Sequence, residues 1–114
     1  MKISFETREG FLIVRAHEAV LDVGNAGEFK QALVDAIGER AVTLIVDISG
    51  VHEIDSSGLG ALVAALKAAR KFGGTVKLCG AEPPVRSVIE MTRIHRVLPL
   101  HATAEEAMRG EVPV

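Results

Sequence analysis

The sequence predicts an α/β fold, in which about four helices pack on a mostly parallel sheet of four to five strands that begins with a hairpin. Short apolar runs typical of strands alternate along the chain with segments whose apolar residues recur at helical spacing. This alternation favours parallel strands joined by helical crossovers. No linker or repeat interrupts the order, so we expect residues 1–114 to form a single domain, with 111–114 as a frayed tail.

The N-terminal segment has the pattern of a hairpin. Residues 3–5 alternate between apolar and polar types, Glu9-Gly10 is a turn signal, and residues 11–16 form a second apolar run.

A first helix is expected after Asn25. Asn25 and Glu28 have the spacing of a capping box, in which each side chain satisfies a backbone amide of the first turn. The helix should end at Gly38. Its apolar face comprises Ala26, Phe29, Leu33 and Ile37.

The centre of the chain is the most informative part. Residues 42–48 are nearly all aliphatic or β-branched, as in a strand covered on both faces. Residues 57–72 should form an amphipathic helix that ends at Gly73-Gly74, with Asp55 or Ser56 accepting hydrogen bonds from its first free amides. The apolar face of this helix comprises Leu59, Leu62, Val63, Leu66 and Ala69.

A further strand and helix follow. Residues 75–79 form a short apolar strand in which Cys79 is expected to be a core side chain. Pro83-Pro84 suits the first turn of a helix whose shared face comprises Val85, Val88, Ile89 and Thr92.

The last two elements are short. Residues 96–100 are expected to form an edge strand because Pro99 has no amide to donate. Thr103 with Glu106 predicts the capped start of a final helix.

Composition excludes several classes of protein. No apolar run approaches the roughly 20 residues of a membrane span, and no leader pattern opens the chain, so we expect a soluble protein. A single cysteine excludes an internal disulfide and agrees with a cytoplasmic location. With 13 basic and 15 acidic residues, no Trp or Tyr, and four phenylalanines expected in the core (Phe5, Phe11, Phe29 and Phe72), direct nucleic-acid binding is not expected.

Catalytic and metal sites are not expected either. A hydrolase nucleophile elbow would need glycine where Ile54 stands, and a dinucleotide fingerprint would need a third glycine where Val63 stands. The four histidines have no metal-ligand spacing (His17, His52, His95 and His101). We therefore expect no enzyme, no cofactor and no bound metal.

The chain resembles the STAS domain family, named for sulfate transporters and anti-sigma factor antagonists, and is most similar to the free-standing bacterial antagonists. The resemblance rests mainly on Val46-Asp47-Ile48-Ser49 leading into Ile54-Asp55-Ser56-Ser57-Gly58-Leu59-Gly60. Leu21-Asp22 followed by Asn25-Ala26, and the ending Arg96-Val97-Leu98 with 103–107, match as well. Two turns depart from the family, which often has glycine before Leu21 and near Arg93.

The resemblance implies a partner switch controlled by phosphorylation. Ser56 would be phosphorylated by an anti-sigma factor that is also a serine kinase, and a PP2C-type phosphatase would restore the unmodified form. The unmodified antagonist would bind the kinase and thereby free the sigma factor. The implied partner-binding residues are Asp22, Asn25, Asp55, Ser56, Ser57, Gly58, Leu59 and Gly60, with the two glycines of the motif letting the partner approach the helix start.

Two alternatives remain open from the sequence. Residue type alone favours Ser56 as a simple helix cap, with Asp55 competing for that role. STAS domains also serve as adaptor subunits of transporters or signalling scaffolds, without serine phosphorylation. We expect a monomer or weak dimer.

Overall fold

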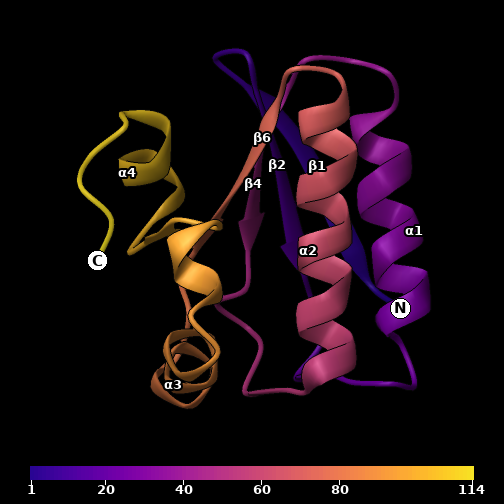
Figure 1. Ribbon diagram of the computed structural model, residues 1–114, viewed down its shortest axis with the longest axis vertical. Coiled ribbons are helices and arrows are strands. Elements are labelled where there is room, and N and C mark those ends of the chain that lie inside the picture. Colours follow the sequence, from indigo (N-terminus) through magenta and orange to yellow (C-terminus); the bar gives the residue numbers. More distant parts are fainter.

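The computed structural model describes residues 1–114 as a five-stranded sheet with helices on both faces (Figure 1). The strands lie in the order β1-β2-β4-β6-β7, and only β1 runs antiparallel to its neighbour. Their bounds are β1 Ile3–Arg8, β2 Phe11–Ala16, β4 Thr43–Asp47, β6 Thr75–Cys79 and β7 Leu100–His101. The predicted fold class and the N-terminal hairpin are confirmed.

Four α-helices accompany the sheet: α1 Ala26–Ile37, α2 Ser56–Lys71, α3 Pro83–Met91 and α4 Ala104–Met108. Helices α1 and α2 lie side by side against one face, with the first turns of both at the carboxyl ends of the parallel strands, toward the bottom of Figure 1. None of these helices combines the length and the apolar composition that a membrane span requires.

The central strand β4 is buried on both faces, as its sequence predicts. Leu44 and Val46 join the large core beneath α1 and α2, whereas Ile45 belongs to a small cluster beneath α4. The alternation follows from the two-residue period of a strand. Helix α4 is therefore the cover of the second face.

Two neighbouring residues on this second face, Cys79 and His101, are buried polar or titratable groups. Cys79 is buried, and burial raises the pKa of its thiol to about 12, so it is a core side chain as predicted. His101, only 3% exposed, has no hydrogen-bond partner at either ring nitrogen. Its pKa is lowered, first by burial and then by Lys77, against the opposing effect of Glu106 and Glu111.

Several sequence predictions were wrong in detail. The last strand covers only Leu100–His101 rather than 96–100: Arg96 ends a 3₁₀ helix, η1 (Ile94–Arg96), and residues 97–99 are not in a strand. Phe5 is 53% exposed rather than in the core, since it lies on the edge strand β1. The tail, 111–114, has no regular structure, although the amide of Val114 donates to the carbonyl of Leu100 at 2.8 Å.

Two short strands escaped the sequence analysis altogether. β3 (Val20–Leu21) and β5 (Glu53–Ile54) pair in parallel and form a separate two-stranded sheet. Two-residue strands carry too little periodicity to be recognised. Their pairing is what assembles the candidate site.

Candidate functional site

The β3–β5 pair brings two loops together that are about thirty residues apart in the chain. Leu21 lies opposite Ile54, and the amide of Asp55 donates to the carbonyl of Leu21 at 3.1 Å. The turn that begins at Asp22 therefore lies beside the start of α2. The structure thus joins the two sequence motifs, one around Asp22 and Asn25 and one around Ser56, on a single surface.

The carboxylate of Asp55 holds this surface together. Its Oδ1 accepts hydrogen bonds from the amides of Ser57 and Gly58, at 2.8 and 3.0 Å, and thereby caps α2. Its Oδ2 accepts a third, from the amide of Val23 in the neighbouring loop, at 3.2 Å. Between the two cap candidates offered by the sequence, the structure selects Asp55.

Ser56 is consequently left free. It is the first residue of α2, it is exposed, and its hydroxyl makes no hydrogen bond within the chain. The next residue, Ser57, is half-buried. Of the two serines, only Ser56 is exposed and has its hydroxyl free at the positive end of the helix dipole.

Asn25 does not form the predicted capping box. Its side chain bridges the preceding turn, accepting from the amide of Asp22 at 3.0 Å and donating to the carbonyl of Val20 at 2.8 Å. Glu28 instead pairs with the N-terminal amine at 2.9 Å. Asn25 competes for nearby backbone groups, as short polar side chains do outside helices, and so stabilises the turn rather than the helix.

The turn beside Asp55 has one more internal contact. The Oδ1 of Asp22 accepts from the amide of Gly24 at 2.9 Å. Val23, held between them, is 80% exposed. The turn therefore presents a large apolar side chain to solvent beside Asp55, the residue that precedes Ser56.

The two glycines of the motif have different surroundings. A Cβ on Gly58 would lie 2.7 Å from both the carbonyl oxygen of Leu21 and the Cγ1 of Ile54, whereas a Cβ on Gly60 would meet nothing within 4 Å. Gly58 is thus required by close packing of α2 on β3 and not only by an approaching partner. Gly60 is exposed and open.

A groove of about 620 Å³ begins at Ser56 and runs along α2. The residues that α2 contributes are Ser56, Leu59, Gly60, Val63, Ala64 and Lys67. Lys30 of α1, and Thr92 and Ile94 from the segment after α3, complete it. We call this feature the Ser56 groove. The sequence analysis missed Lys30 and Lys67, although the spacing of Ser56, Gly60 and Lys67 could have shown one stripe of a helix.

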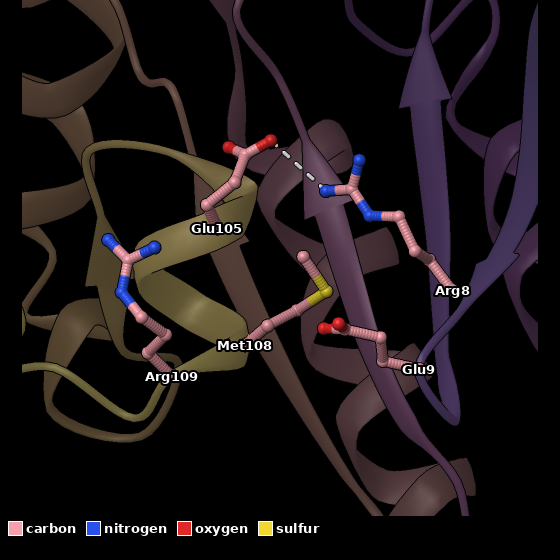
Figure 2. A pocket seen from close by; sticks show the side chains of 5 residues that line it. All are labelled: Arg8, Glu9, Glu105, Met108 and Arg109. Carbon is pink, nitrogen blue, oxygen red and sulfur yellow. Dashed lines mark hydrogen bonds and ion pairs between the residues drawn. The ribbon is translucent and has the colours of Figure 1, made fainter.

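A second hollow, of about 390 Å³, lies at the opposite end of the sheet, between the hairpin turn and α4 (Figure 2). Its lining is mostly charged, and Arg8 pairs with Glu105 at 3.1 Å across it. No residue predicted for the site lies there. The groove beside Ser56 is therefore the relevant one.

Comparison with known proteins agrees with this geometry. The STAS domain profile matches residues 2–107, so the chain belongs to the STAS domain family. Among curated relatives, the anti-sigma F factor antagonist of Paenibacillus polymyxa is 26% identical over 109 residues, covering 95% of this chain and 92% of its own length.

Solved structures of the same type superpose over nearly the whole chain. The anti-sigma factor antagonist SpoIIAA in its unphosphorylated form is 25% identical, with a TM-score of 0.77 and coverage of 97% of this chain and 99% of its own. The murine anion transporter Slc26a9 also contains this fold, at 23% identity and a TM-score of 0.76, within 17% of its length. The family role supported by the free-standing relatives is therefore that of an anti-sigma factor antagonist.

Proposed function

We propose that this protein is an anti-sigma factor antagonist whose binding to an anti-sigma factor with serine kinase activity is switched off by phosphorylation of Ser56. The observation that carries the proposal is the exposed, unbonded hydroxyl of Ser56 beside a cap already supplied by Asp55. A relative of the same fold, SpoIIAA, has been solved in a phosphorylated form. The proposal places the protein in the cytoplasm, without catalytic activity of its own.

The charges around Ser56 explain how one phosphate could act as a switch. Asp22, Glu53 and Asp55 lie on the two paired strands or immediately after them, so the site already carries negative charge. A phosphate adds about −1.5 to −2 charges, against roughly +0.5 from the helix terminus. A partner carboxylate ~6 Å away would be repelled by on the order of 5 kcal/mol at an effective dielectric of ~20, before salt screening.

The direct test is phosphosite mass spectrometry after incubation with ATP and an anti-sigma factor kinase encoded near the gene. We expect modification of Ser56 in the wild type and none in Ser56→Ala, with Ser57→Ala as the matched control that is still modified. Modification confined to Ser57, or none with any such kinase, would contradict the proposal.

Binding provides the second half of the test. Ser56→Ala should remain bound to the kinase, whereas Ser56→Asp should mimic the released form. A PP2C-type phosphatase should return the phosphorylated protein to the binding form. Equal binding of both variants, or co-purification with a transporter permease and no kinase, would favour an adaptor role instead.

A further inference from the structure

The Ser56 groove lies along one stripe of α2 and has a regular composition. Ser56 and Lys67 stand at its two ends, and Gly60, Val63 and Ala64 lie between them. These positions follow each other at intervals of three to four residues, so they face the same side of the helix. At about 1.5 Å of rise per residue, the stripe is roughly 16 Å long, enough for two to three turns of a helical segment.

The middle of the groove is apolar and incompletely covered. Val63 and Ile94 pack against the large core but are only partly buried. A Cβ added at Gly60 would meet no atom within 4 Å. Close by, at the end of α3, Met91 is 82% exposed. A segment with an apolar face would therefore bury surface here that the chain leaves open.

The rim of the groove is basic and unpaired. Lys30 and Lys67 are both exposed, and neither ammonium group forms an ion pair. Four arginines elsewhere on the molecule do form them (Arg8, Arg15, Arg86 and Arg109). None of the acidic residues near Ser56 (Asp22, Glu53 and Asp55) lines the groove. The charged side chains that line the groove are therefore two lysines and no carboxylate, a lining that complements carboxylates of a partner.

We infer that the Ser56 groove receives an acidic amphipathic segment of the partner, with its apolar face over Gly60 and Val63 and its carboxylates beside Lys30 and Lys67. The inference rests on the proposed function, since the partner is the kinase that modifies Ser56. Ser56 lines the groove itself, so a phosphate there enters the space that the segment occupies. It also repels the carboxylates of the segment and competes with them for the two lysines.

The test uses the whole protein and the purified kinase shown to modify Ser56, with the dissociation constant as the readout. Lys67→Glu should weaken binding at least tenfold, whereas Lys71→Glu, the same change one turn further along α2 and outside the groove, should change it less than twofold. Replacing a carboxylate of the bound kinase segment by lysine should restore binding to Lys67→Glu.

A second variant tests the apolar part of the groove. Gly60→Leu should fill it and weaken binding at least tenfold. The thermal midpoint should stay at or above that of the wild type, because position 60 is exposed, a Cβ there meets no atom within 4 Å, and leucine favours a helix more than glycine does. If Lys67→Glu and Gly60→Leu both bind normally while phosphorylation of Ser56 still abolishes binding, the groove inference is wrong and the switch stands. If no anti-sigma factor kinase binds or modifies the protein, both proposals fall.

Discussion

The two glycines of the motif around Ser56 offer a sharp test of the packing between α2 and β3. Alanine at position 58 would place its Cβ 2.7 Å from the backbone oxygen of Leu21 and 2.7 Å from Ile54, distances at which something must move. Alanine at position 60 would meet no atom within 4 Å. The same substitution, two residues apart on one helix, should therefore have opposite effects.

The expected magnitudes follow from the cost of overpacking and from helix propensity. Overpacking of this kind costs about 1–3 kcal/mol, because a backbone oxygen cannot move aside like a flexible side chain. At the open position, alanine should stabilise the helix by roughly 0.5–1 kcal/mol relative to glycine. The free energies of unfolding of the two variants should thus differ by about 1.5–4 kcal/mol.

The assay is reversible unfolding in urea, followed by circular dichroism, with a thermal scan as the second measurement. At about 4 °C per kcal/mol for a domain of this size, the midpoints of Gly58→Ala and Gly60→Ala should lie roughly 6–16 °C apart. Equal stabilisation by both substitutions would refute the close contact between α2 and β3, and with it the geometry that brings Asp22 beside Asp55.

Three further predictions concern single side chains. Asp55→Ala should lower the free energy of unfolding by about 1–2 kcal/mol, because it removes the helix cap and the hydrogen bond to the neighbouring loop. Asp55→Asn retains a hydrogen-bond acceptor, so its free energy of unfolding, measured in the same urea titration, should fall by less. The pKa of His101 is lowered in the folded protein, so the unfolded chain binds a proton at this residue more readily. The contribution of His101 to stability should be fully present above about pH 6.5 and should be lost as the pH falls toward the pKa of the folded state. This part of the pH dependence should disappear in His101→Leu, and an unchanged dependence of the unfolding free energy on pH would exclude His101 as its source. Arg93 has a φ of 61°, in the left-handed region, so Arg93→Gly should raise the free energy of unfolding by about 0.5 kcal/mol and the thermal midpoint slightly. A clear loss of stability in this variant would show that the arginine side chain stabilises the turn.

Elements with strong periodicity could be predicted from the sequence. The buried strand before Asp47, the amphipathic stripe of α2 and the Thr103 cap each rest on local patterns, and each is confirmed. At Arg93, where the resemblance led us to expect glycine in the turn, the backbone lies in the left-handed region that favours glycine. The capping box at Asn25 failed because its side chain had nearer backbone partners across the turn, which spacing along the chain does not reveal.

By itself, the sequence determined the fold class, the central strand and helix, and the serine that stands at their junction, because alternating periodicity and helix-end residues act locally. Only the tertiary structure decided that Asp55 caps α2 and leaves the hydroxyl of Ser56 free, since that choice depends on the β3–β5 pair. It also decided that Lys30, from another helix, joins Lys67 on one groove. Contacts between residues distant in the chain arise from packing of the whole core, and no local pattern encodes them.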